Sequence, residues 1–112
     1  MQQVPVSQLQ ALIDSLGPQA RPVLLDVREA WEVQTASMSV PGATTVHIPM
    51  NEVPQRLAEL DAQQPLLSLC HHGMRSQQVA MFLDRQGFTQ VFNVTGGIDA
   101  WSREVDPAVP RY

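Results

Sequence analysis

Cysteine is almost absent from this chain, and so are several other features that would point to particular classes of protein. The 112 residues contain one cysteine, Cys70, so no disulfide can form within the chain and a disulfide-built scaffold is excluded. No apolar stretch approaches the ~20 residues that a membrane span needs. The formal net charge is −4, whereas nucleic-acid binders are usually basic and anionic membrane surfaces attract basic segments. We therefore expect neither nucleic acid nor membrane as a partner.

The size and the first residues of the chain bound its organisation. The length fits one compact domain over residues 1–112, and the hydrophobic fraction of 44% is ordinary for a protein with a packed core. Residues 1–5 carry neither a basic nor an apolar run, so we expect no secretory leader. The cytoplasm, whose reducing conditions suit a free thiol, is the expected location.

Helical patterns and short apolar runs alternate along the chain. Apolar and β-branched runs predict strands over residues 23–27, 44–48, 66–69 and 91–94. Amphipathic spacing, with Ser7, Asn51 and Ser76 as N-caps, predicts helices over 7–16, 29–35, 51–60, 76–87 and 98–103.

This alternation predicts an α/β fold, a parallel sheet covered by helices on both faces. In such sheets ligands bind beyond the carboxyl ends of the strands. Asp26 and Cys70 lie where two of the predicted strands end, and Gly96 and Gly97 follow a third. We expect all of them at one edge of the sheet.

The most informative stretch runs from Leu66 to Ser76. A short apolar run ends in Cys70, a loop with Gly73 at its centre follows, and Ser76 opens a helical pattern. Glycine permits backbone angles that side chains forbid, and successive amides in such a turn converge on an anion. The positive end of the helix reinforces that site and stabilises a thiol there as thiolate, the reactive form of cysteine.

These residues predict covalent sulfur transfer. Attack of the Cys70 thiolate on a sulfane sulfur gives a persulfide, Cys–S–S⁻, whose outer sulfur the loop amides hold until an acceptor removes it. Two half-reactions of this kind give ping-pong kinetics. Arg75 adds a fixed cation, and Ser76 donates a hydroxyl or caps the helix. A lone cysteine is more often a buried small hydrophobe, but the polar, glycine-containing junction favours a nucleophile here. We expect no cofactor.

His71 and His72 raise the question of a metal site. Adjacent histidines do not share a face on a regular element, and a cysteine followed by two imidazoles is not a common zinc spacing. Nothing in the sequence brings His47 to them. We therefore expect no metal and expect both imidazoles to line the mouth of the pocket as hydrogen-bond donors.

The loop Cys70-His71-His72-Gly73-Met74-Arg75-Ser76 resembles the active-site loop of rhodanese-domain sulfurtransferases. Other stretches resemble further motifs of that family in the family's order: Leu25–Glu29, Val40–Ala43 followed by His47–Pro49, and Val94–Trp101. The resemblance spans nearly the whole chain. It implies a five-stranded, mainly parallel sheet flanked by helices.

The resemblance also implies roles for individual residues. Cys70 would carry the persulfide, and the outer sulfur would be bound by His71, His72, Gly73, Met74, Arg75 and Ser76. Asp26 and Arg28 match positions that organise the base of the family's active site; the alternative is a partly buried ion pair that locks two strands. Trp31 and Trp101 are expected to be packing residues, with Trp31 as a possible flank of the pocket.

The expected donor is a small sulfur-containing anion such as thiosulfate, or a persulfide. Many thiosulfate-using members of the family have a basic residue where this chain has His71, so we expect weaker attraction for the thiosulfate dianion. Residues 38–40 also depart from the family pattern before the turn at Pro41, which is expected to alter the rim of the pocket. A protein sulfur donor or acceptor is a further candidate partner.

Three alternatives stay open. A cysteine-dependent phosphatase or arsenate reductase of this fold needs five residues between cysteine and arginine, and only four separate Cys70 from Arg75. An inert docking module is disfavoured by the intact cysteine and loop. A sulfur carrier that works beside a partner fits the sequence as well as free-standing transfer to a small acceptor.

Overall fold

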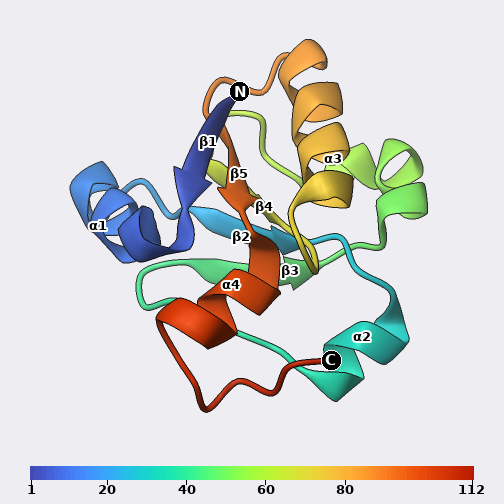
Figure 1. Cartoon of the computed structure of the whole chain (residues 1–112). Helices are drawn as coiled ribbons and strands as arrows, with labels where there is room; N and C mark the ends of the chain where they lie inside the picture. Colours follow the sequence, from blue (N-terminus) through green and yellow to red (C-terminus); the bar gives the residue numbers. More distant parts are fainter.

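The computed structural model describes residues 1–112 and contains one five-stranded sheet with helices on both faces (Figure 1). The strands lie in the order β1-β5-β4-β2-β3, and every neighbouring pair is parallel. The predicted α/β fold is therefore confirmed. The strands are β1 (Gln2–Pro5), β2 (Val23–Asp26), β3 (Thr44–His47), β4 (Leu66–Leu69) and β5 (Val91–Thr95).

The helices α1, α3 and α4 divide between the two faces of the sheet. On one face α1 packs beside α4, and on the other α3 lies over β4 and β5 (Figure 1). Two short 3-10 segments stand next to α3. The elements are α1 (Val6–Leu16), α2 (Ala30–Thr35), η1 (Met50–Glu52), η2 (Pro54–Glu59), α3 (Met74–Arg85) and α4 (Gly97–Glu104).

The central strand β4 separates two hydrophobic cores. Because successive side chains of a strand point to opposite faces, Leu66 joins the core under α3, whereas Leu67 and Leu69 join the core under α1 and α4. All four residues of β4 are buried, as expected of a parallel strand covered on both sides. Cys70, in the next position, packs with the core under α3. The pleat therefore turns its side chain toward the start of that helix.

The carboxyl ends of β2, β4 and β5 meet at one edge of the sheet. The amide of Val27 donates to the carbonyl of Leu69 at 2.9 Å, and the amide of Ile98 donates to the carbonyl of Cys70 at 3.0 Å. The helices α2, α3 and α4 all begin there. The expectation that Asp26, Cys70 and the glycine pair share this edge is confirmed.

Some local features differ from the predictions. The sequence pattern indicated four strands and missed β1, the polar N-terminal strand that pairs with β5 and buries only Val4. Ser7 does not cap α1, because that helix begins at Val6 without a side-chain cap. The segment 51–60 forms two 3-10 segments in place of an α-helix. Pro54 lacks the N–H that an α-helix interior needs, so it starts the second segment.

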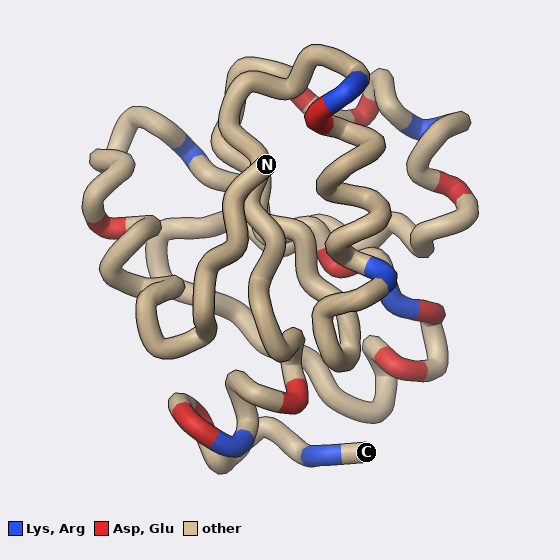
Figure 2. Tube along the Cα trace, turned by 45° about the horizontal axis from the view of Figure 1, so that its top comes forward, with Lys and Arg blue, Asp and Glu red and all other residues tan.

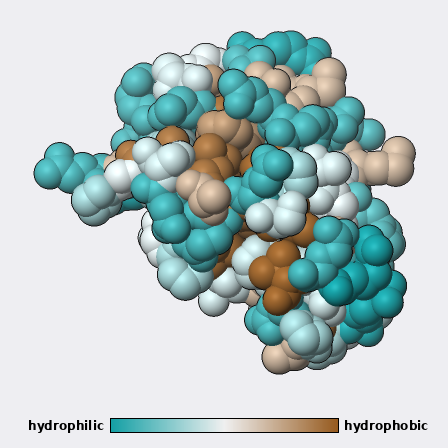
Figure 3. All heavy atoms as spheres, turned by 60° about the vertical axis from the view of Figure 1, so that its left-hand side comes forward, coloured by the Kyte–Doolittle hydropathy of each residue, from teal (hydrophilic) through white to brown (hydrophobic).

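Acidic and basic residues are mixed along the chain, and neither kind forms a long continuous run. Figure 2 shows acidic and basic positions interspersed along the trace. On the face that carries α1, hydrophobic residues show as limited patches between hydrophilic ones (Figure 3). No helix has both the length and the apolar character to span a membrane.

Candidate functional site

The Cys70 loop (residues 70–76) connects β4 to α3 and directs a backbone amide at the thiol. Gly73 adopts φ 106°, a left-handed conformation that favours glycine, and its amide donates to the Cys70 Sγ at 3.0 Å. Cys70 is 1% exposed. The thiol is therefore covered by the protein on nearly all sides.

Most of the loop amides have no acceptor within the protein. None of the hydrogen bonds of the chain uses the amides of His71, His72, Met74, Arg75 or Ser76. The last three of these amides open α3, where no intrahelical acceptor exists. Free N–H groups in a loop beside a cysteine have the polarity to bind a small anion.

Gly97 lets the first turn of α4 approach the Cys70 loop closely. The amides of Ile98 and Asp99 donate to the carbonyls of Cys70 and His71 at 3.0 and 3.1 Å. A Cβ at Gly97 would collide with those same two carbonyl oxygens. This close approach explains why a glycine with φ 62° stands there.

Ser76 does not lie where the sequence placed it. The helix α3 starts two residues earlier than predicted, at Met74, with Gly73 as its N-cap. The Ser76 hydroxyl is buried and donates to Asn93 Oδ1 of β5 at 2.6 Å. Asn93 Nδ2 in turn donates to the Gly73 carbonyl at 3.1 Å. The side chain of Ser76 thus anchors the start of α3 to the sheet and does not cap the helix.

Arg75, expected as a fixed cation of the loop, forms an ion pair. Its guanidinium donates to both carboxylate oxygens of Glu32 on α2, at 2.7 and 2.9 Å. Glu32 is 3% exposed, and hydrogen bonds from Arg75 are the main reason that its pKa falls to about 2. The charge of Arg75 is therefore compensated by an ionised carboxylate at neutral pH.

Asp26 and Arg28 form the buried ion pair that the sequence left as one of two possibilities. Nε and Nη2 of Arg28 donate to the two carboxylate oxygens of Asp26 at 2.9 and 2.7 Å. Arg28 is fully buried and also donates to the carbonyls of Glu32 and Ala36. The pair thus fastens the end of β2 to α2, and does not join two strands.

Tyr112 links these two ion pairs to the loop, a role that no pattern in the sequence predicts. Its hydroxyl donates to Glu32 Oε2 at 2.7 Å and accepts from Arg28 Nη1 at 2.9 Å. Its ring stacks on the His71 ring, with centroids 3.9 Å apart and planes 6° apart. Burial raises the pKa of Tyr112 to about 12, so the hydroxyl keeps its proton at neutral pH.

The imidazoles lie in different surroundings. His71 Nε2 is buried without a hydrogen-bond partner, and burial followed by the neighbouring His72 lowers the pKa of His71. His71 is therefore neutral near pH 7, and the prediction that it donates a hydrogen bond at the mouth of the pocket stays a prediction. The side chain of His72 is 64% exposed.

His47 Nε2 lies 2.7 Å from the Arg28 carbonyl. No three His, Cys, Asp or Glu side chains form a metal-binding group.

The two tryptophans and Met74 differ in how far they are exposed. Trp101 is buried, as expected of a packing residue, whereas Trp31 is 61% exposed and meets Tyr112 edge-on. Met74 is 77% exposed at the start of α3. These two exposed apolar residues are the sequence neighbours of the ion pair: Met74 precedes Arg75, and Trp31 precedes Glu32.

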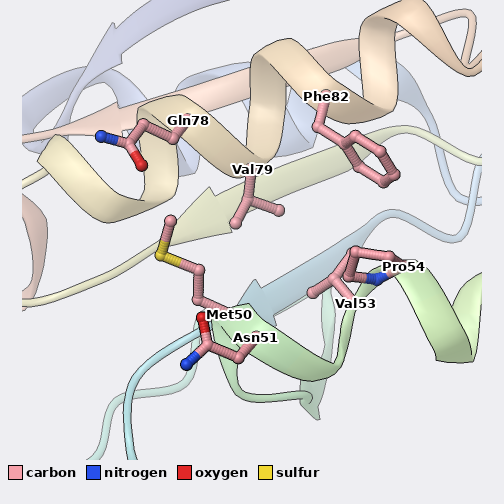
Figure 4. Close-up of a pocket in the computed structure, with 7 residues that line it drawn as sticks. All are labelled: Met50, Asn51, Val53, Pro54, Gln78, Val79 and Phe82. Carbon is pink, nitrogen blue, oxygen red and sulfur yellow. The ribbon is translucent and has the colours of Figure 1, made fainter.

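The hollows of the surface lie elsewhere. One of about 340 Å³ opens between α3 and the 3-10 segments, where Val79 and Phe82 face Met50 and Val53 (Figure 4). None of the three hollows is lined by a residue of the Cys70 loop. The thiol and its amides form the candidate site, because the hollows bring no nucleophile or ion pair together.

Sequence reasoning missed Glu32, Asn93 and Tyr112. Glu32 had a local signal, since Glu29 and Glu32 form a capping box at the start of α2. Its partner Arg75 lies 43 positions away, and Tyr112 lies 80 positions from Glu32. Such distant pairings leave no periodic pattern in one sequence.

The fold and the loop together define the class of protein: a parallel α/β domain with a cysteine at the carboxyl edge of its sheet, followed by a loop whose backbone amides are mostly free. The model of the rhodanese-like domain matches residues 5–104. The chain belongs to this family.

Several curated relatives carry sulfur-transfer names. The chain is 44% identical over 84 residues to the putative sulfurtransferase YtwF of Bacillus subtilis, covering 75% of this chain and 77% of that protein. It is 36% identical over 98 residues to the thiosulfate sulfurtransferase GlpE of Pseudomonas savastanoi pv. phaseolicola, covering 88% and 84%. These relatives support a rhodanese-type sulfurtransferase at the level of class.

Other relatives are longer. The chain spans 30% of the rhodanese-like/PpiC domain-containing protein 12 of Arabidopsis thaliana, at 41% identity over 80% of this chain. Among solved structures, a rhodanese-related protein from Thermoplasma volcanium superposes with a TM-score of 0.76 at 27% identity, and each chain covers all of the other. The predicted family resemblance is confirmed.

Proposed function

We propose that this protein is a sulfurtransferase that moves a sulfane sulfur to a thiophilic acceptor through a persulfide on Cys70. The observation that carries the proposal is the Gly73 amide 3.0 Å from Sγ, within a loop whose other amides have no acceptor. Backbone donors fixed in this way stabilise negative charge without having to reorganise during the reaction.

The two half-reactions balance without a cofactor. With thiosulfate, the Cys70 thiolate attacks the outer sulfur, the S–S bond of thiosulfate breaks, and sulfite leaves with the bonding electron pair. The product is Cys–S–S⁻, whose outer sulfur carries the charge that the loop amides face. An acceptor such as cyanide then attacks that sulfur, thiocyanate forms, and the Cys70 thiolate returns.

The residues around the thiol have supporting roles in this proposal. The amides from His71 to Ser76 bind the outer sulfur, and the Asp26–Arg28 and Arg75–Glu32 pairs fix the elements that frame the loop. Met74 and His72 border it from the exposed side. Neither ion pair leaves a free cation beside Sγ.

This charge balance supports a persulfide, a monoanion, as an alternative to thiosulfate, a dianion. Both arginines are neutralised by carboxylates, and His71 is neutral because burial lowers its pKa. The Bacillus subtilis relative YrkF, 39% identical over 74% of this chain, is named a putative sulfur carrier protein, and this chain spans 43% of it. A protein sulfur donor or acceptor is therefore part of the proposal. A reducing compartment such as the cytoplasm would keep the thiol available.

The alternative functions find less support. A phosphatase needs its arginine over the loop to clamp two phosphate oxygens, whereas both arms of Arg75 are bound to Glu32. A docking module without chemistry has no need for free amides around a thiol.

Steady-state kinetics test the proposal. Thiosulfate and cyanide are varied against each other, and thiocyanate is measured, for the wild type and for Cys70→Ser. Parallel double-reciprocal lines with the wild type and no turnover with Cys70→Ser are expected. Intersecting lines, or turnover by Cys70→Ser, would exclude a Cys70 persulfide as the intermediate.

A further inference from the structure

Tyr112 contacts three parts of the candidate site, although it lies beyond the segment 5–104 that matches the family. Its hydroxyl joins Glu32 to Arg28, and its ring lies flat on His71. Neighbouring Val109 is buried, so the segment that carries Tyr112 is packed against the body of the protein.

The stack with Tyr112 is well placed to hold the first residue of the loop after the cysteine. His71 Nε2 has no hydrogen-bond partner. Burial lowers the pKa of His71, and a hydrogen bond with the Tyr112 backbone acts in the opposite direction, so the end of the chain makes a polar contact with the imidazole as well. The ring itself contacts two others, Tyr112 in a parallel stack and His72 at an angle of 31°. Aromatic pairs of this kind contribute beyond the area that they bury.

The backbone of His71 connects this stack to the thiol. Its carbonyl accepts from the amide of Asp99 at 3.1 Å, and its own amide is one of the free donors of the loop. Motion of the His71 ring would therefore move the His71 amide, a hydrogen-bond donor next to Cys70. The hydroxyl of Tyr112 acts at a different place, since it contacts the ion pairs and not the loop.

We propose that Tyr112 is a positioning residue for sulfur transfer, whose ring, stacked on His71, holds the Cys70 loop in the geometry that receives the transferred sulfur. The proposal rests on the proposed function, because the reaction it serves is the loading of Cys70.

Two substitutions separate the ring from the hydroxyl. Tyr112→Phe keeps the stack on His71 and removes both hydroxyl hydrogen bonds. Tyr112→Leu keeps apolar volume and removes the planar ring. Val105→Ala is the matched control, since Val105 lies in the same segment, is 43% exposed and has no place in the site.

The experiment is single-turnover loading of Cys70 from thiosulfate, followed by intact mass at increasing thiosulfate concentration. For Tyr112→Leu we expect the maximal loading rate to fall about 3- to 10-fold at an unchanged half-saturating concentration. Tyr112→Phe and Val105→Ala are expected to load within about 2-fold of the wild type. Partial unfolding would lower the amplitude of loading and leave its rate constant unchanged, which separates a positioning role from a structural one.

Each other outcome overturns the proposal. A Tyr112→Leu rate constant equal to that of the wild type would remove the role of the ring. A Tyr112→Phe rate constant as low as that of Tyr112→Leu would assign the effect to the hydroxyl. If Tyr112→Leu does not fold, Tyr112→Met serves in its place with the same expectation. No loading in the wild type would overturn the proposed function itself, and the positioning role with it.

Discussion

Replacing Glu32 by glutamine removes the one carboxylate that holds both Arg75 and the hydroxyl of Tyr112. The substitution keeps the shape of the side chain and removes its charge. Because Glu32 is 3% exposed while its partner Arg75 is 36% exposed, the pair is half-buried and contributes more than a surface ion pair.

The pKa of Glu32 gives the size and the sign of the effect. The hydrogen bonds from Arg75 lead the causes that lower this pKa from 4.5 to about 2. At ~1.4 kcal/mol per pKa unit, the difference between the unfolded and folded pKa values of Glu32 corresponds to about 3 kcal/mol. We reduce this free energy to about 2 kcal/mol because Arg75 is partly solvated. A lowered pKa in the folded state stabilises the protein above the unfolded value of about 4.5, and this contribution is lost as the pH falls toward 2.

Urea unfolding of the wild type and of Glu32→Gln at pH 7, 5, 4 and 3 measures this contribution. We expect a difference in unfolding free energy of about 2 kcal/mol at pH 7 that shrinks as the pH falls below 4.5. Glu59→Gln is the control, because Glu59 binds Arg56 with the same two-pronged geometry on the open surface and should cost much less. A difference that stays constant with pH, or one no larger than that of Glu59→Gln, would refute the reasoning.

Three further substitutions test the frame of the loop by urea unfolding. Gly97→Ala should cost about 2–4 kcal/mol, since φ is positive and the new methyl group collides with carbonyls of the loop; a cost below 1 kcal/mol would contradict this close approach. Ser76→Ala should cost about 1–2 kcal/mol by leaving Asn93 Oδ1 without its donor, and an unchanged midpoint would mean that this hydrogen bond contributes nothing. Arg28→Met should cost about 3–5 kcal/mol because Asp26 stays buried without its partner, and a stable variant would show that the pair is dispensable.

The parts of the fold that the sequence predicts well are those with a strong local pattern. The strand β4 was predicted with its observed bounds, because a continuous apolar run is what burial on both faces requires. The position of Cys70 at the carboxyl edge follows from that strand and from the parallel arrangement. The glycine of the loop follows from the turn that it has to make, and its φ of 106° agrees.

The parts that escaped prediction depend on distant partners. The strand β1 buries one side chain, so it carries no alternation that a sequence could reveal. Serine is a residue type that often caps helices, yet the Ser76 hydroxyl donates a hydrogen bond to Asn93 of β5. Arg75 has the spacing of a loop cation, yet Glu32 of α2 binds it. In each case tertiary structure supplies a partner that outweighs the local preference.

The intact mass of the protein after incubation with a sulfur donor tests the central claim most directly. Wild type and Cys70→Ser are each incubated with thiosulfate, and separately with a polysulfide, and then treated with cyanide. A gain of one sulfur in the wild type, lost on addition of cyanide and absent from Cys70→Ser, is the result that a Cys70 persulfide predicts. A wild-type mass unchanged by both donors, or a gain of sulfur that persists in Cys70→Ser, would contradict it.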